Sequence, residues 1–251
     1  MIKIISQLLF VCFLILGACK QKPITVYMAG DSTMANKKPE KFPETGWGMK
    51  ISQFFNENTR FENHAKNGRS TRTFIEEGRW DSLISKLKAD DIVFIQFGHN
   101  DQSKHKVDRY TSPEDYYRNL CRFVDDVHAK EAIPILFTPV MRRRFNENSV
   151  FYDVHGEYPD LVRAAAEEKG VALIDMHKLS EKLLVDYGEQ ESKKIFLQGE
   201  PGELKNYPNG IEDNTHFNER GATEMAMLVV RAIKESDTSL KKRIKKDVFN
   251  H

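Results

Sequence analysis

Four short runs of mostly apolar residues, separated by stretches with helical periodicity, constrain this chain more than any other feature. The runs cover residues 24–29, 91–97, 133–138 and 171–174, and a weaker candidate covers residues 61–65. Near-continuous apolar runs are typical of strands that are covered on both faces of a sheet. Strands that alternate with helices predict a parallel sheet between two helical layers, so we expect an α/β fold with three layers.

Helical patterns fill the segments between these runs. Ser112 and Pro113 form a helix start, and apolar residues at helical spacing follow them. The segment that begins at Glu219 has the same spacing, and residues 80–87 and 160–169 are further candidates. No internal repeat or low-complexity linker divides the chain, so we expect one domain over residues 19–251, with its basic tail (241–246) solvated and frayed.

Residues 1–18 are predicted to be a lipoprotein signal peptide. Lys3 precedes fifteen mostly apolar residues, which end in Leu16-Gly17-Ala18 directly before Cys19. This apolar stretch is short for a transmembrane helix, and small residues before a cysteine are typical of a bacterial lipobox. The alternative is an ordinary signal peptide with an incidental cysteine. We expect Cys19 to carry lipid and to anchor an exported bacterial protein, either periplasmic or at the cell surface.

Charge and cysteine content exclude several classes of protein. The chain has 38 Lys and Arg against 37 Asp and Glu, which excludes a nucleic-acid-binding surface that covers the whole protein. Three cysteines cannot form a disulfide framework, and Cys121 is expected to be a small buried apolar residue. Removing residues 1–18 removes one lysine and no acid, so the remaining chain is formally neutral.

Polar clusters follow three of the predicted strands. Residues 30–33 follow the first run, 67–70 follow the weak run, and 98–101 follow the run at 91–97. A fourth cluster, 213–216, precedes the last predicted helix. Ligands of such sheets bind beyond the carboxyl ends of the strands, so we expect these clusters to form one site.

These clusters contain the groups that acyl transfer by a serine nucleophile requires. Ser32 needs a base to remove its proton, His216 is suited to that task, and Asp213 can orient the imidazole. The backbone amides of Ser32 and Gly68 and the side chain of Asn100 can stabilise an oxyanion. The alternative for Ser32 and Asn100 is a structural role in a turn. Ser70 is a rival nucleophile, although its neighbours offer no base.

Four ordered blocks resemble those of the SGNH (GDSL-like) hydrolases. They are Gly-Asp-Ser at 30–32, the glycine at 68, Gly-x-Asn-Asp at 98–101 and Asp-x-x-His at 213–216. The resemblance implies a flavodoxin-like α/β/α fold and a serine esterase that needs no cofactor and no metal. It also implies that Ser32 is the nucleophile, that Gly68 and Asn100 complete the oxyanion hole, and that Asp213 and His216 complete the triad.

A narrower similarity is to the rhamnogalacturonan acetylesterase branch of that family. It rests on Gly-Asp-Ser-Thr at 30–33 together with residues 67–74, 77–81, 155–159 and 213–217. Asn67 departs from the pattern, which has a small residue before the glycine. The similarity implies that the substrate is an O-acetylated polysaccharide of the plant cell wall, with rhamnogalacturonan first.

Arginines near the expected site are candidates for contacts with galacturonate carboxylates, because a guanidinium binds a carboxylate through two parallel hydrogen bonds. The candidates are Arg69, Arg72, Arg142 and Arg143. A solvated loop is the alternative for the run at 142–144. Because the chain without its leader is neutral, attraction to a polyanionic glycan has to be local.

Other functions stay open. The chain could be an acetyl esterase on xylan or another glycan, or a general short-chain GDSL esterase or lipase. A metallophosphoesterase is disfavoured, because His99 and Asn100 stand in the reverse order for a Gly-Asn-His-Asp motif. A non-catalytic glycan-binding lipoprotein would not need the Ser, His and Asp set. No Gly-x-Ser-x-Gly elbow of an α/β-hydrolase is present.

Overall fold

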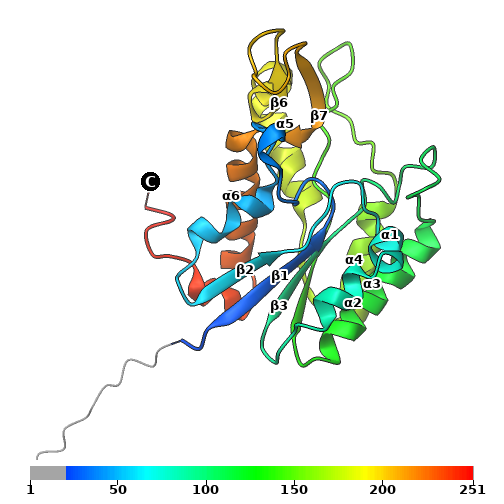
Figure 1. The fold of residues 1–251 in the computed structure, drawn as a ribbon, viewed down its shortest axis with the longest axis vertical. Coiled ribbons are helices and arrows are strands. Elements are labelled where there is room, and N and C mark those ends of the chain that lie inside the picture. The colour runs from blue at the N-terminus through cyan, green and yellow to red at the C-terminus, as the bar shows by residue number, and fades with distance from the viewer. Residues whose placement is uncertain (1–20, 251) are drawn as a thin grey trace, which may run out of the picture.

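The computed structural model describes residues 21–250 (Figure 1). The predicted signal peptide and Cys19 lie outside these residues, so both stay predictions. Among the described residues, no helix is long and apolar enough to cross a membrane.

A five-stranded parallel sheet forms the centre of the fold. Its order is β2-β1-β3-β4-β5, with bounds Thr59–Asn63, Ile24–Gly30, Ile92–Gln96, Ile133–Phe137 and Ala172–Ile174. This is the strand order of flavodoxin-like folds. Each of the five predicted runs forms a strand, so the predicted α/β fold class is confirmed.

Helices cover both faces of this sheet (Figure 1). One face packs against α1 to α4, whose bounds are Thr71–Glu76, Arg79–Ile84, Pro113–His128 and Tyr158–Lys169. The other face packs against α5 (Met176–Ser192), α6 (Glu219–Glu235) and short 3-10 helices. Along β1, Val26 and Met28 belong to the second core, whereas Tyr27 and Ala29 belong to the first. This alternation is expected of a strand that is buried on both faces.

A separate two-stranded antiparallel hairpin stands above the sheet. It consists of β6 (Phe196–Gly199) and β7 (Ile211–Phe217), and it was not predicted from the sequence. The polar run Asp213-Asn214-Thr215 has low strand propensity, which hid β7 from pattern analysis. Thr45 binds the hairpin through its backbone N–H, which donates to the Phe217 carbonyl at 2.9 Å.

The carboxyl-terminal segment corrects one expectation. Residues 241–246 were predicted to be frayed, but Ile244 forms a β-bridge with Phe55, and Leu240 before them is buried. The Arg243 guanidinium donates to the backbone carbonyls of Asn58 (3.1 Å) and Lys22 (2.7 Å). Arg243 thus has a structural role as a hydrogen-bond donor, which composition alone does not indicate.

Candidate active site

Ser32, His216 and Asp213 form a hydrogen-bonded row at the carboxyl edge of the sheet. Ser32 Oγ lies 2.8 Å from His216 Nε2, and His216 Nδ1 lies 2.7 Å from Asp213 Oδ2. An ionised carboxylate only accepts hydrogen bonds, so Nδ1 carries the proton and Nε2 presents a lone pair to the serine hydroxyl. This is the tautomer that a general base requires.

The Asp213 carboxylate is held in its ionised form. Burial by itself would raise its pKa, but hydrogen bonds from the His216 side chain and from the backbone N–H groups of Thr215 and His216 lower the pKa to about 2. A permanent negative charge beside Nδ1 stabilises the imidazolium that forms when His216 takes a proton.

Two different elements position the row. Ser32 follows the buried end of β1, where the neighbouring Asp31 is fully buried and accepts hydrogen bonds from the Thr33 backbone and hydroxyl at 2.9 and 2.8 Å. Asp213 and His216 both belong to β7, in the hairpin outside the main sheet. The nucleophile and its base are therefore 184 positions apart in sequence and meet only through the tertiary fold.

The loops after β1, β2 and β3 bring the expected oxyanion donors together, because β1 pairs with both other strands. Gly68 has a φ of +76°, a conformation that favours glycine. Asn100 is 8% exposed, and its Nδ2 donates to the Arg69 carbonyl at 2.9 Å. This bond uses one of two amide hydrogens, so the second remains for a ligand.

A buried lysine connects the first two of these loops, and sequence analysis missed it. The Lys37 ammonium donates to the Ser32 carbonyl (2.6 Å) and to Asn67 Oδ1 (2.9 Å), and it pairs with Glu44 (2.7 Å). The side chains of Lys37 and Glu44 are only 2% and 9% exposed. Asn67, which departs from the family pattern, therefore serves as an acceptor that fixes the loop before Gly68.

We expect Lys37→Met to lower kcat roughly tenfold to a hundredfold while KM changes little, because the donor spacing between Ser32 and Gly68 relaxes. Glu44→Gln, which keeps the shape of that side chain, should have the smaller effect because Lys37 retains its two oxygen acceptors. Steady-state kinetics with an acetyl ester, together with a melting curve, measure both effects. An unchanged kcat in a folded Lys37→Met protein would contradict the positioning role.

Comparison with known proteins identifies the family. The model of the GDSL-like lipase/acylhydrolase family matches residues 28–223, which include every residue of the row. The chain belongs to this family. This match confirms two predictions from the sequence, the family and the enzyme class of ester hydrolase.

Two curated relatives from Bacillus subtilis (strain 168) are similar over nearly their whole length. Rhamnogalacturonan acetylesterase RhgT is 43% identical over 221 residues, covering 88% of this chain and 94% of the relative. A probable rhamnogalacturonan acetylesterase, YesY, is 36% identical and covers 88% and 98%. Each of these two matches covers most of this chain.

Solved structures share the fold of this acylhydrolase. The YxiM protein of Bacillus subtilis superposes with a TM-score of 0.73 at 26% identity, covering 87% of this chain and 58% of that one. An acetylxylan esterase from Geobacillus stearothermophilus superposes with a TM-score of 0.60 at 18% identity, covering 84% and 94%.

The four arginines predicted to contact substrate have different surroundings. Arg69 and Arg72 form ion pairs with Glu77 (2.8 Å) and Glu76 (3.1 Å). Arg143 is 5% exposed and donates to Ser192, Asn214 and the Glu189 carbonyl, so its guanidinium holds the hairpin in place. A carboxylate ligand would have to displace these partners, whereas Arg142 is half-buried and its acceptors, Thr215 Oγ1 and the His99 carbonyl, carry no charge.

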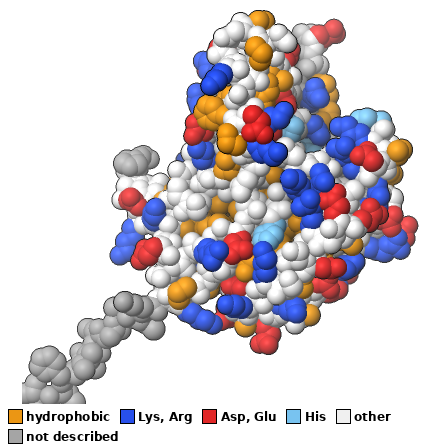
Figure 2. All heavy atoms as spheres, viewed as in Figure 1, with side chains coloured by type: hydrophobic (Ala, Val, Ile, Leu, Met, Phe, Trp, Pro, Cys, Tyr) orange, Lys and Arg blue, Asp and Glu red, His pale blue; other side chains and the backbone are white. Residues whose placement is uncertain are grey.

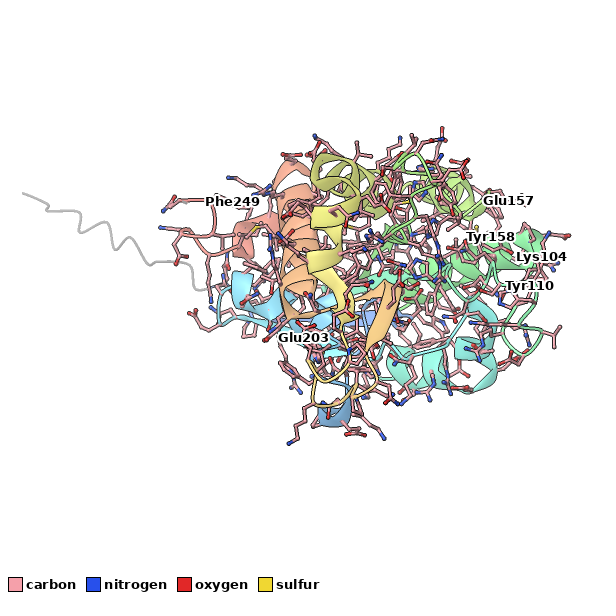
Figure 3. The ribbon with its side chains drawn as sticks, turned by 90° about the horizontal axis from the view of Figure 1, so that it is seen from above. Lys104, Tyr110, Glu157, Tyr158, Glu203 and Phe249 are labelled. Atoms are coloured by element: carbon pink, nitrogen blue, oxygen red, sulfur yellow. The ribbon has the colours of Figure 1, made fainter. Side chains whose placement is uncertain are left out.

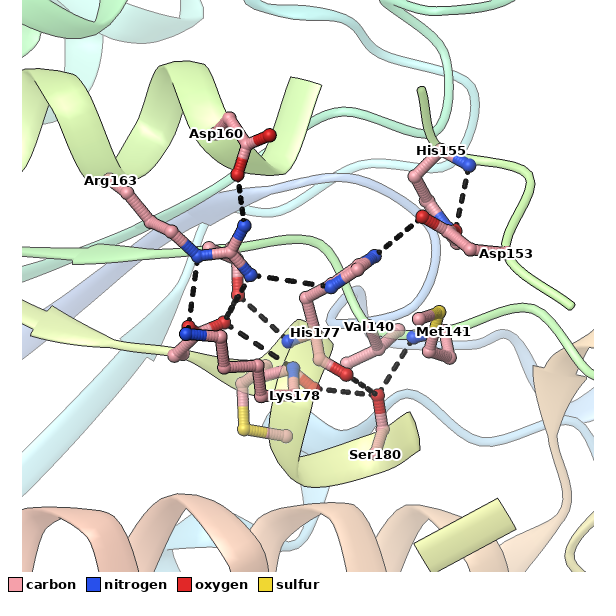
Figure 4. A network of polar contacts seen from close by, with 12 residues as sticks. Val140, Met141, Asp153, His155, Asp160, Arg163, His177, Lys178 and Ser180 are labelled. Atoms are coloured by element: carbon pink, nitrogen blue, oxygen red, sulfur yellow. Dashed lines mark hydrogen bonds and ion pairs between the residues drawn. The ribbon is translucent and has the colours of Figure 1, made fainter. Parts of the chain in front are cut away.

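A polar network lies behind the site (Figure 4). Asp153 accepts hydrogen bonds from His155 Nδ1 (2.7 Å) and His177 Nε2 (3.1 Å), and these ligand-type atoms lie within 4.8 Å of one another. Arg163 Nη2 faces His177 Nδ1 at 3.3 Å, so that nitrogen acts as an acceptor and Nε2 carries the proton. A metal ion would need the Nε2 lone pair, so these residues fit a hydrogen-bond network better than a cation site.

Trp47, which lies between two glycines in the sequence, belongs to the core. It is fully buried, and its Nε1 donates to Gln96 Oε1 at 2.9 Å. Cys121 is partly buried and packs against the core beneath α3, close to its predicted role.

Proposed function

We propose that this acylhydrolase removes O-acetyl groups from a plant cell-wall polysaccharide, with rhamnogalacturonan as the first candidate. The observation that carries the proposal is the Ser32–His216–Asp213 row, with contacts of 2.8 and 2.7 Å, in a chain 43% identical to a rhamnogalacturonan acetylesterase. Family membership supports acyl hydrolysis, and the similarity to RhgT supports the choice of substrate.

The first half of the reaction acylates the serine. His216 Nε2 takes the Ser32 hydroxyl proton while Oγ bonds to the acetyl carbonyl carbon. The carbonyl oxygen becomes an oxyanion, which the amides of Ser32 and Gly68 and the Asn100 side chain stabilise. His216 then gives its proton to the sugar oxygen as the ester bond breaks, and the acetyl group stays on Ser32.

The second half repeats these steps with water as the nucleophile. His216 takes a proton from the water, whose oxygen bonds to the acetyl carbon, and the same donors stabilise the second oxyanion. Ser32 Oγ leaves, regains its proton from His216, and acetate is released. No step requires a metal, so we propose that chelation leaves turnover unchanged.

Acetate release from a panel of substrates tests this proposal. The panel contains acetylated rhamnogalacturonan, acetylated xylan, and 4-nitrophenyl esters with short and long chains. We expect the highest kcat/KM on rhamnogalacturonan. A preference for xylan would make acetylated xylan the substrate in place of rhamnogalacturonan. A preference for long aliphatic esters would overturn the assignment to a carbohydrate substrate.

We expect Asn100→Ala to reduce kcat about a hundredfold or more, as measured for other lost oxyanion donors. KM should change much less, because the second amide hydrogen acts on charge that develops only in the transition state. The Arg69 carbonyl also loses its partner, so a melting curve is needed beside the kinetics. A folded variant with nearly normal kcat would assign Asn100 to the turn alone.

We also propose that Cys19 anchors the protein to a membrane. The described chain enters β1 at Ile24, at the amino edge of the sheet, whereas Ser32 lies beyond the carboxyl edge. An anchor near residue 19 would therefore leave the site on the far side of the sheet from the membrane. Fatty-acid labelling of the expressed protein tests this, and labelling that survives Cys19→Ser would contradict it.

A further inference from the structure

A basic pocket lies next to the catalytic row. It is about 410 Å³ in volume, and its charged or titratable lining side chains are His105, Lys106, Arg142 and Arg144. No acidic side chain lines it. A pocket of this size can hold a sugar residue. Figure 2 shows Lys, Arg and His side chains together on the upper right shoulder of the molecule, where the loop after β3 lies.

The positive charges in this pocket lack carboxylate partners. Within residues 21–250, no ion pair forms to Lys106, Arg142 or Arg144, although the nearby Arg69, Arg72 and Arg109 are each paired with a carboxylate. In a chain with almost equal numbers of acids and bases, this local excess of positive charge is a feature of the pocket rather than of the composition. It is suited to an anionic ligand.

Arg142 connects the pocket to the catalytic machinery. Its Nη1 donates to Thr215 Oγ1, one residue before His216, and its Nη2 lies 3.4 Å from the His99 carbonyl, one residue before Asn100. The guanidinium is half-buried with only neutral acceptors in hydrogen-bond contact, and burial lowers its pKa. A buried charge without a paired carboxylate is costly, and an anionic ligand would offset that cost.

The pocket has fixed walls. Val154 lines it between Asp153 and His155, both of which belong to the network of Figure 4. The loop that carries His105 and Lys106 ends at Thr111, whose carbonyl accepts a hydrogen bond from the Tyr158 hydroxyl at 2.7 Å. Figure 3 shows Lys104 and Tyr110 of this loop at the same end of the molecule as Glu157 and Tyr158.

We infer that this pocket is a subsite for the carboxylate of a uronate residue that neighbours the acetylated sugar. The inference rests on the proposed function, which places a glycan at Ser32. Lys106 and Arg144 supply exposed donors, and Arg142 supplies the charge nearest to the catalytic turn. The predicted contact with the polyanion thereby shifts from Arg69, Arg72 and Arg143 to a pocket whose cations form no ion pair within residues 21–250.

Binding of oligosaccharides that cannot be deacetylated tests this subsite. Calorimetry compares trigalacturonate with the neutral xylotriose, using the wild-type protein and the double variant Lys106→Gln/Arg144→Gln. The matched control is Lys88→Gln/Lys130→Gln, which removes the same charge from exposed positions at the amino edge of the sheet. Binding is measured at low and at high salt.

We expect trigalacturonate to bind the wild-type protein and the control alike, and the pocket variant about tenfold more weakly, with the difference reduced by salt. Xylotriose should bind weakly to all three. Equal affinity of wild type and pocket variant, equal losses in the pocket variant and the control, or no binding of trigalacturonate would overturn the subsite. Acetate release from a neutral acetyl ester, measured separately, decides whether the proposed esterase stands when the subsite fails.

Discussion

Replacing Ser32 with alanine should reduce acetate release by on the order of a millionfold. The Oγ atom forms the bond to the acetyl carbon, and no other hydroxyl in the described chain forms a hydrogen bond to His216 Nε2. The side chain is small and donates only to His216, so the melting temperature should change little. Acetate release from 4-nitrophenyl acetate and from the polysaccharide, measured with a melting curve, checks this result.

Ser70→Ala is the informative companion to that variant. Ser70 caps α1, where its hydroxyl accepts from the Thr73 backbone N–H at 3.2 Å, so its loss should cost about 1 kcal/mol of stability. Acetate release should largely survive this change. Activity that persists in Ser32→Ala but disappears in Ser70→Ala would mean that Ser70, and not Ser32, is the nucleophile.

Asp213→Asn should reduce kcat about ten-thousandfold with little change in KM. An asparagine amide directed at Nδ1 donates a hydrogen bond instead of accepting one, so the imidazole proton moves to Nε2. The base then has no lone pair for the Ser32 hydroxyl. Kinetics on the purified variant measure the effect, and nearly normal turnover would mean that another group orients His216.

The pKa of Asp213, about 2, determines the pH range in which its carboxylate is charged. Because the folded-state pKa lies below the usual value near 3.9, this carboxylate contributes stability above that value and loses it as the pH falls towards 2. At every pH above about 4 this acid is ionised, so titration of Asp213 itself contributes no pH dependence to wild-type kcat there, which a pH profile of kcat measures.

The sheet could be predicted because its strands are near-continuous apolar runs, which leave few alternatives for burial. The hairpin could not, because the middle of β7 (213–216) consists of half-buried polar residues, two of which belong to the catalytic row. Helix α5 was missed for a related reason. It buries only a few of its seventeen residues and contains Gly188 in a non-helical conformation, so its periodicity is weak.

The catalytic row was predictable because its blocks keep their order and spacing in sequence. Lys37 and Glu44 were not, because they lie in irregular segments and become buried only when the loops after β1 and β2 meet. The basic pocket was partly predicted through Arg142. Its lining residues His105 and Lys106 come from a different loop, the one after β3. The pairing of Arg69 and Arg72 with glutamates depends on contacts that composition does not reveal.

The hairpin determines where this protein can tolerate changes in length. Leu197 pairs with Asp213 and Phe196 pairs with Phe217, and the register shifts between these two pairs, so His216 lies in an irregular segment whose two ends are fixed. Residues added between 200 and 210 extend a connecting loop and leave that register intact. Deleting one residue between 213 and 216 would instead shorten the irregular segment that lets His216 Nδ1 reach Asp213 Oδ2, and would break that 2.7 Å contact. Natural relatives should therefore vary in the length of this loop and keep the Asp-to-His interval constant.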